Sequence, residues 1–151
     1  MKTNILMVCL GNICRSPLAE GILQDKLNTA SFYVDSAGTG DYHIGNPPDI
    51  RSIAVAKKHG IDISNQKCRQ FKKEDFSAFD YIYVMDAKNY QNIIALATNQ
   101  EEKLKVKLLL SELNLDNNEV PDPYWDDNGF EHVFQLIDSA CTIVAEKLNS
   151  K

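Results

Sequence analysis

Apolar and polar positions follow two different patterns along this chain. Residues 4–10 form an almost unbroken apolar run, which is typical of a strand buried on both faces. Near the other end, apolar residues from Phe130 to Leu148 recur at a period of about 3.6 residues, which predicts a long amphipathic helix. Shorter runs predict further strands at 32–36, 81–85 and 105–110, and helices at 49–59 and directly after residues 16 and 86.

Strands that alternate with helices predict an α/β fold, with a parallel sheet that carries helices on both faces. The chain shows no internal repeat, low-complexity tract or linker, so residues 1–151 are expected to form a single domain. Ligands of such sheets bind beyond the carboxyl ends of the strands. The segment between the first strand and the first helix is therefore the expected place for a binding site.

Polar residues mark the starts of two predicted helices. Ser16 is expected to cap the first helix, with Pro17 at its first position, where the missing N–H loses no hydrogen bond. Asp86 is expected to cap the helix that follows the third strand. Asp86 and Asn89 are thus expected to tie loops together and to take no part in chemistry.

The composition limits the classes of partner. A formal net charge of −5 gives no overall positive field for nucleic acid. The apolar start of the chain is too short to span a bilayer and shows no cleavage site, so we expect a cytoplasmic protein that does not use a membrane, with a monomer as its default state. Four cysteines and three scattered histidines, without CxxC or HxxxH, favour a reducing compartment over a disulfide scaffold or a metal site.

Reactive residues concentrate in the stretch CLGNICRS at positions 9–16. Three interpretations compete: a metal or disulfide site, a buried structural thiol, and a nucleophile in an anion-binding loop. Backbone N–H groups turned inward before a helix N-terminus bind anions, and Gly11 permits such a turn. The fork of Arg15 matches two phosphate oxygens, and the same positive field favours the thiolate of Cys9. The position of the stretch in the predicted fold favours the third interpretation.

A thiolate that attacks a phosphate ester needs a proton donor, because the departing oxygen must be protonated. Asp122 in the stretch VPDPYW is the best candidate, since prolines on both sides fix its backbone. Tyr124 and Trp125 limit its solvation, which favours the protonated carboxyl. By itself this stretch also fits an acidic surface turn. Because Cys9 is a matching nucleophile, we favour the interpretation of Asp122 as the proton donor.

Five motifs lie along the chain in a specific order: CLGNICRSP at 9–17, AEG at 19–21, VDSAG at 34–38, MDxxN at 85–89 and DPYW at 122–125. Together they resemble the low-molecular-weight protein tyrosine phosphatases over the whole length of the chain. The resemblance implies three layers, with a central four-stranded parallel sheet flanked by helices and a phosphate-binding loop between the first strand and the first helix. It implies a hydrolase that acts on phosphotyrosine in proteins, releases inorganic phosphate and requires no cofactor and no metal.

Matched by motif, the resemblance implies a two-step reaction. Cys9 would be the nucleophile that forms a cysteinyl-phosphate, and Arg15 would clamp the phosphate. Asp122 would act first as general acid and then as the base that activates water.

The resemblance also implies roles for the residues around the nucleophile. Asn12, Ser16 and Ser36 would form a hydrogen-bond network that shapes the loop and stabilises the thiolate. Cys14 would be the redox partner of Cys9, which makes the enzyme sensitive to oxidation. The phosphate-binding loop would comprise Leu10, Gly11, Asn12, Ile13, Cys14 and Ser16.

The same resemblance places a substrate pocket beside this loop. Tyr42, Tyr124 and Trp125 would line it, together with Leu10 and Ile13. A deep apolar slot favours phosphotyrosine over the shorter phosphoserine, whose phosphorus would not reach the nucleophile.

Three other functions share parts of this pattern. Protein-arginine phosphatases carry threonine where Ile13 stands and lack the double aromatic at 124–125. A thiol-linked arsenate reductase relays electrons through two further cysteines, and segment 86–100 contains none. A phosphoprotein-binding module with a dead site would have lost Cys9, Arg15 or Asp122. Phosphotyrosine hydrolysis is the expected function, with the two other enzymes as alternatives on the same fold.

Overall fold

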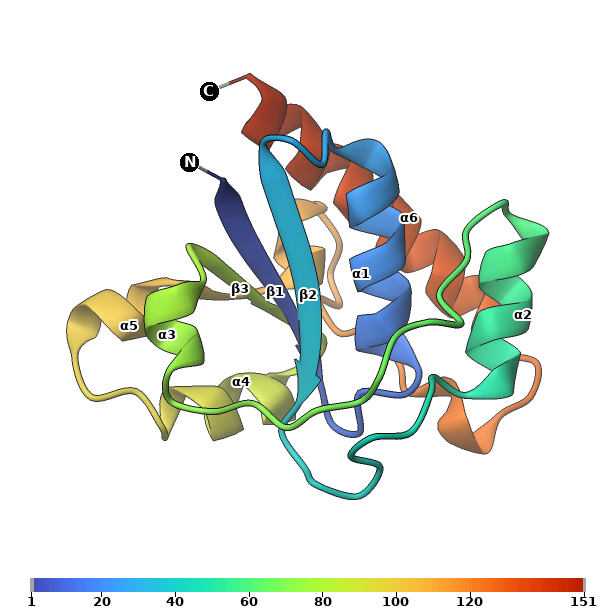
Figure 1. The fold of residues 1–151 in the computed structure, drawn as a ribbon, viewed down its shortest axis with the longest axis horizontal. Helices are drawn as coiled ribbons and strands as arrows, with labels where there is room; N and C mark the ends of the chain where they lie inside the picture. Colours follow the sequence, from blue (N-terminus) through green and yellow to red (C-terminus); the bar gives the residue numbers. More distant parts are fainter. Residues whose placement is uncertain (1, 151) are drawn as a thin grey trace.

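A computed structural model describes residues 2–150, so Met1 and Lys151, the ends of the expected domain, lie outside the described residues. Within that range four strands form one parallel sheet in the order β2-β1-β3-β4 (Figure 1). The predicted four-stranded parallel sheet is confirmed. The strands are β1 (Thr3–Cys9), β2 (Phe32–Gly38), β3 (Tyr81–Val84) and β4 (Val106–Leu108).

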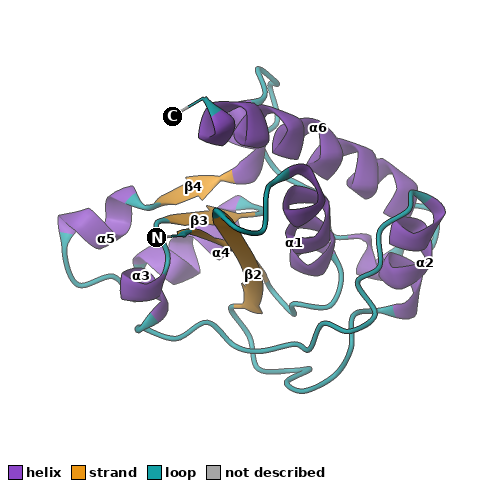
Figure 2. Cartoon of the chain, turned by 45° about the horizontal axis from the view of Figure 1, so that its top comes forward, coloured by secondary structure: helices purple, strands orange, loops and turns teal. Residues whose placement is uncertain are grey.

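Helices cover both faces of the sheet, as the alternation of elements predicted (Figure 2). On one face α1 (Arg15–Lys26), α2 (Ile50–Lys58) and α6 (Phe130–Asn149) pack together. On the other face lie α3 (Asp75–Ala78) and α4 (Ala87–Ile94), and α5 (Gln100–Leu104) lies beside β4. Two short 3₁₀ helices, Leu109–Glu112 and Pro123–Trp125, complete the elements.

Strand β1 explains the unbroken apolar run at the start of the chain. Ile5, Met7 and Cys9 belong to the core beneath α1 and α6, whereas Leu6 and Val8 belong to the core beneath α3 and α4. Successive side chains of a strand point to opposite faces. A central strand with a core on each face is therefore apolar along its buried part, which here runs from Ile5 to Cys9.

The start of the first helix differs from the prediction. Helix α1 begins at Arg15, so Ser16 is a helical residue and not the cap, and Pro17 is the third residue. Cys14 occupies the cap position without a side-chain hydrogen bond to the helix. The Ser16 hydroxyl faces Cys9 and Asn12 instead. Asp86 does cap α4, as predicted, and accepts a hydrogen bond from the Asn89 backbone N–H.

The fourth strand is shorter than predicted, and two short helices were missed. Residues 109 and 110 lie in the 3₁₀ helix after β4, where both leucines are buried. An apolar run records burial and does not distinguish a strand from a single helical turn. Helices α3 and α5 have four and five residues, too few to show a helical period.

The segment after β1 lies at the carboxyl edge of the sheet, between β2 and β3. Thr39 and Gly40 donate backbone hydrogen bonds to Cys9 and Leu10, so the chain after β2 supports this segment. A Cβ atom at Gly38 would lie 2.8 Å from the Leu10 carbonyl oxygen, so only glycine allows this close approach. In residues 2–150 we find no helix long and apolar enough to cross a membrane.

Candidate active site

The loop from Cys9 to Arg15 turns sharply around the sulfur of Cys9. Asn12 has a φ of 57°, in the left-handed region, and its backbone N–H donates to Cys9 Sγ at 3.3 Å. Ser16 Oγ lies 3.1 Å from the same sulfur. The thiol is buried at the end of β1, with these two polar groups directed at it. Such contacts stabilise a negative sulfur.

Arg15 is held beside this loop by groups from two distant segments. Its Nη1 donates to the Asp86 carboxylate at 2.7 Å and to the Val120 carbonyl at 3.0 Å. Its Nη2 lies 3.8 Å from Asp122 Oδ2. The side chain is buried, so the guanidinium is fixed by specific partners and has little freedom to move. The ion pair with Asp86 was not foreseen, since only the helix-capping role of that residue was predicted.

Asp122 stands at the mouth of the site on the segment before α6. Its Oδ1 accepts the Tyr124 backbone N–H at 3.0 Å and so caps the 3₁₀ helix. The neighbouring Val120 N–H donates to the Met85 carbonyl at 2.8 Å and extends the contact with the end of β3. One carboxylate oxygen is thereby committed to the turn, whereas the other faces Arg15.

Arg51, which the sequence did not single out, ties the two sides of the site together. Its guanidinium bonds both carboxylate oxygens of Asp49, and it also pairs with Asp127. The Asp49 N–H donates to the Ile13 carbonyl at 2.7 Å, which links this group to the loop around Cys9. Arg51 Cζ lies 5.5 Å from the centre of the Tyr124 ring, within cation–π range.

A pocket of about 420 Å³ brings most of the predicted site residues together. Tyr42 is 70% exposed and Trp125 is 86% exposed, so these two form a rim, whereas Tyr124 is half-buried. The ring of His43 lies 6.4 Å from that of Tyr124, and no spacing in the sequence pointed to it. The lining residues are Cys9, Leu10, Gly11, Ile13, Cys14, Arg15, Tyr42, His43, Asp122, Tyr124 and Trp125.

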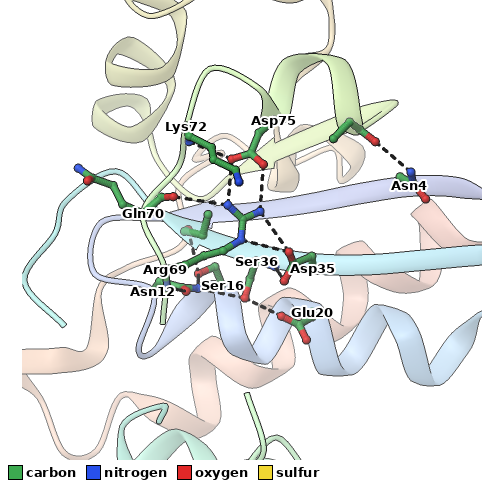
Figure 3. Close-up of polar contacts among 12 residues, drawn as sticks. Asn4, Asn12, Ser16, Glu20, Asp35, Ser36, Arg69, Gln70, Lys72 and Asp75 are labelled. Atoms are coloured by element: carbon green, nitrogen blue, oxygen red, sulfur yellow. Dashed lines mark hydrogen bonds and ion pairs between the residues drawn. The ribbon is translucent and has the colours of Figure 1, made fainter. Parts of the chain in front are cut away.

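Asn12, Ser16 and Ser36 lie behind the pocket and do not line it. The Asn12 side-chain amide donates to Ser16 Oγ at 2.7 Å and to Ser36 Oγ at 3.0 Å. Ser36 Oγ in turn donates to Glu20 at 2.7 Å (Figure 3). Glu20 belongs to the AEG motif at 19–21, but the sequence assigned it no role. Its position four residues after Ser16 on a predicted helix was the available indication, because residues at that spacing share a face.

The other thiols have different surroundings. Burial, followed by the charges of Asp49 and Cys9, raises the pKa of Cys14 to about 12. Cys68 Sγ donates to the Asn12 carbonyl, and burial raises the pKa of its thiol to about 11. Cys141 is fully buried in α6, the position expected from its place on the core face of that helix.

The described side chains thus join a nucleophilic sulfur, an arginine fork and a carboxyl group in one pocket. In residues 2–150, no group of three or more His, Cys, Asp or Glu side chains could hold a metal ion. The arrangement suits displacement at an anionic centre, with charge on the anion stabilised by Arg15.

Comparisons with known proteins agree with this chemistry. The family model described as low molecular weight phosphotyrosine protein phosphatase matches residues 4–151. The human protein named low molecular weight phosphotyrosine protein phosphatase is 41% identical over 150 residues, which cover 95% of this chain and 94% of that protein.

Solved structures show the same fold. YfkJ from Bacillus subtilis superposes with a TM-score of 0.92 at 38% identity, over 99% of this chain and 96% of that one. Wzb from Vibrio vulnificus, in a complex with benzylphosphonate, has a TM-score of 0.85 at 34% identity, over 97% of this chain and 99% of that one. The chain therefore belongs to the low molecular weight phosphotyrosine protein phosphatase family.

Proposed function

We propose that this chain is a protein-tyrosine phosphatase that hydrolyses phosphotyrosine in proteins by way of a cysteinyl-phosphate. The observation that carries the proposal is the pocket in which Cys9, Arg15 and Asp122 meet. Membership of the phosphatase family supports it, as does the benzylphosphonate complex of a relative, because that ligand joins an aromatic ring to a phosphonate.

In the first step the Cys9 thiolate attacks phosphorus and the bond from phosphorus to the tyrosine oxygen breaks. The leaving phenoxide takes its proton from Asp122, so tyrosine departs as a neutral phenol. Arg15 stabilises the charge on the transferring phosphoryl oxygens, and its ion pair with Asp86 keeps the guanidinium in place.

In the second step a water molecule attacks the cysteinyl-phosphate. Asp122, now a carboxylate, takes a proton from that water while the bond between sulfur and phosphorus breaks. The Cys9 thiolate is restored and inorganic phosphate leaves. Asn12 and Ser16 support the thiolate at both stages, because each directs a polar group at the sulfur.

The shape of the pocket favours an aromatic phosphate. Leu10, Ile13 and Tyr124 supply its apolar surface, and the exposed Tyr42 and Trp125 can contact the residues beside the phosphotyrosine. Cys9 is buried at the base of this pocket, so a short side chain cannot bring its phosphorus to the sulfur. We also propose that the protein acts in the cytoplasm as a monomer, and that residues 1–151 form a single domain.

The decisive experiment measures phosphate release in the presence of EDTA from a phosphotyrosine peptide and a phosphoarginine peptide, with Cys9→Ser as control. Release from phosphotyrosine alone, abolished by Cys9→Ser, is the expected result. Preferential release from phosphoarginine would show that the chain is a protein-arginine phosphatase instead. Release from neither peptide, together with thiol-dependent reduction of arsenate, would assign the reductase.

Oxidation of the site is part of the proposal. Peroxide oxidises the Cys9 thiolate to a sulfenic acid, and the Cys14 thiol condenses with it to form a disulfide and release water. Cys14→Ser removes this partner, so oxidation of Cys9 continues to the irreversible sulfinic acid. After peroxide treatment, dithiothreitol is expected to restore the activity of the natural protein and of Cys68→Ser, but not of Cys14→Ser. Equal recovery of all three proteins would contradict the role of Cys14.

A further inference from the structure

A continuous chain of hydrogen bonds runs from an outer hollow of the protein to the sulfur of Cys9. Glu20 on α1 lines that hollow and accepts a hydrogen bond from Ser36 at 2.7 Å. Asn12 joins Ser36 to Ser16 through its side-chain amide, at 3.0 and 2.7 Å. Ser16 Oγ then lies 3.1 Å from Cys9 Sγ. Figure 3 shows Glu20, Ser36, Ser16 and Asn12 side by side, with the Arg69 guanidinium above them.

The position of Asn12 determines which group donates and which accepts in each of these hydrogen bonds. The Arg69 backbone N–H donates to Asn12 Oδ1 at 3.0 Å, so the Asn12 nitrogen must face the two serines. That nitrogen is only a donor, and therefore each serine oxygen accepts from it. Ser36 is left to donate its hydrogen to Glu20, and Ser16 is left to donate its hydrogen to Cys9. The alternative acceptor for Ser16, the Ala37 carbonyl, lies farther away at 3.5 Å.

We propose that Glu20 is a positioning residue for the nucleophile, and that its carboxylate holds this chain in the direction in which Ser16 donates to Cys9. The inference rests on the proposed role of Cys9 and extends it to a residue that does not contact the pocket. A carboxylate can only accept, so it fixes the Ser36 hydroxyl and, through Ser36, the Asn12 amide. A protonated carboxyl can donate to Ser36 and compete with this arrangement.

The charges around Glu20 allow both protonation states. Asp35 on β2 disfavours the carboxylate, and Arg69 favours it. Asp25 and Asp62 line the same outer hollow. Burial, opposed in part by the hydrogen bond from Ser36, raises the pKa of Glu20 to about 7. Near neutral pH the partner of Ser36 is therefore partly a carboxylate, which only accepts, and partly a carboxyl, which can also donate and so weaken the contact of Ser36 with Asn12.

Arg69 fixes the position of Asn12, which lies between Ser36 and Ser16 in this series of hydrogen bonds. Its guanidinium donates to both oxygens of Asp75, at 3.0 and 3.1 Å, and also pairs with Asp35. Asp75 is buried, so this contact fixes the backbone whose N–H orients Asn12. Asn12 thus cannot rotate to repair a lost contact at Ser36 without losing its bond to Arg69.

The test compares Glu20→Ala, Glu20→Gln and Glu20→Ser with the matched control Asp25→Ala, a carboxyl that lines the same hollow. The readout is the pH profile of Cys9 alkylation by iodoacetamide, followed by mass spectrometry of the peptide. It requires no substrate, so it decides the role of Glu20 even if phosphotyrosine hydrolysis fails. Circular dichroism verifies the fold of each variant.

Glu20→Ala is expected to slow Cys9 alkylation at neutral pH by about tenfold, the effect of one lost hydrogen bond to a charged group, and to move the profile to higher pH. Glu20→Gln keeps an acceptor oxygen for Ser36, so its rate is expected to stay within about twofold of the natural protein. Below neutral pH, Glu20→Gln should react at least as fast as the natural protein, because its acceptor does not protonate. Glu20→Ser is too short to reach Ser36 and should match Glu20→Ala.

A double variant tests whether Glu20 acts on Cys9 through the hydrogen bond with Ser36. Ser36→Ala removes the link to Asn12, so adding Glu20→Ala to it is expected to cause no further loss. Full additivity of the two changes would overturn the proposal. It would also be overturned if Glu20→Ala matched Asp25→Ala, or if Glu20→Gln lost as much reactivity as Glu20→Ala. The last result would show that charge, and not an acceptor for Ser36, governs the thiolate.

Discussion

Arg15 and Asp122 each use one part of the side chain for structure and leave the other part for chemistry. Arg15 commits Nη1 to Asp86 and Val120, which leaves Nη2 directed toward Asp122. Asp122 commits Oδ1 to the Tyr124 backbone and leaves Oδ2 toward the pocket. Each group is thus fixed before a substrate arrives, which is the condition for effective stabilisation of a developing charge.

Replacement of Asp122 by asparagine tests the proton donor without removing the turn. The introduced amide oxygen can still accept from the Tyr124 N–H, but the side chain cannot supply a proton. For Asp122→Asn we expect kcat/KM for a phosphotyrosine peptide to fall about 10²- to 10⁴-fold, and to fall less for p-nitrophenyl phosphate, whose phenolate leaves readily without a proton. Steady-state rates across the pH range measure both effects. Equal losses on the two substrates would contradict the role of general acid.

The raised pKa of Glu20 predicts that the free energy of unfolding depends on pH. The pKa of Glu20 rises from 4.5 to about 7 in the folded protein. Above pH 4.5, the pKa of Glu20 in the unfolded chain, the unfolded protein releases a proton that the folded protein keeps. The free energy of unfolding therefore falls as the pH rises toward about 7 and then levels off. Glu20→Gln removes this loss. The free energy of unfolding of Glu20→Gln, relative to the natural protein, should therefore increase between about pH 5 and about pH 8.

Urea unfolding at these two pH values measures the change. Asp25→Ala serves as the control and is expected to show the same difference from the natural protein at both. A constant difference for Glu20→Gln would mean that Glu20 does not keep its proton on folding.

At the scale of elements, Asp122, the proposed acid, is positioned by contacts between a helix and a loop that are far apart in the sequence. Arg51 on α2 stacks against Tyr124 and pairs with Asp127, while Asp49 at the start of α2 holds the loop around Cys9. The distance between nucleophile and acid is therefore set partly by α2. The sequence showed α2 as a helix and offered no reason to connect it with Asp122.

Arg51→Ala should misplace the segment that carries Asp122. We expect kcat/KM for phosphotyrosine to fall about 10- to 100-fold, since small misplacements of reacting groups have effects of this size. Because a misplaced acid matters most for poor leaving groups, the loss should be larger for phenyl phosphate than for p-nitrophenyl phosphate. Lys57→Ala, on the same helix, is the matched control. A loss no larger than that of Lys57→Ala would exclude this role for Arg51.

Elements with a strong local pattern were predictable, and those defined by distant contacts were not. Helix α6 has twenty residues with a clear apolar face, and α4 has a capping aspartate, so both were expected. The start of α1 was misplaced because Ser16 has the chemistry of a cap but faces Cys9 and Asn12. Helix α3 was missed because its buried Asp75 is stabilised by Arg69, and a charged residue gives no local sign of burial.

At the scale of the whole molecule, two cores fix the sheet by covering both faces of β1. The loop after Cys9 emerges at the carboxyl end of the strands, where α1 begins and the start of α2 contacts the loop. An anion bound in the pocket would contact the loop after Cys9, the start of α1 and the segment before α6 together, because all three line it. Binding should therefore stabilise the folded state as a whole, because the unfolded chain does not form the site.

Inorganic phosphate provides the measurement. At about 100 times its Kd it should stabilise the protein by about 2.7 kcal/mol, which corresponds to a rise in Tm of about 5–10 °C for a chain of this length. Arg15→Ala is expected to lose this rise, whereas Asp122→Asn is expected to keep it. A rise that persists in Arg15→Ala would mean that phosphate stabilises the protein at another place.

The sequence by itself determined the alternation of strands and helices, the place of the loop after the first strand, and the nucleophile, arginine and acid as candidates. These follow from local periodicity and from residue chemistry at short spacing, which a linear chain displays directly. Only the tertiary structure decided that Asp86 holds Arg15 and that Arg51 joins α2 to the segment that carries Asp122. It also decided that hydrogen bonds connect Glu20 to Cys9 through Ser36, Asn12 and Ser16. These contacts join residues distant in sequence, and the packing of the two cores, which brings them together, has no short-range signature.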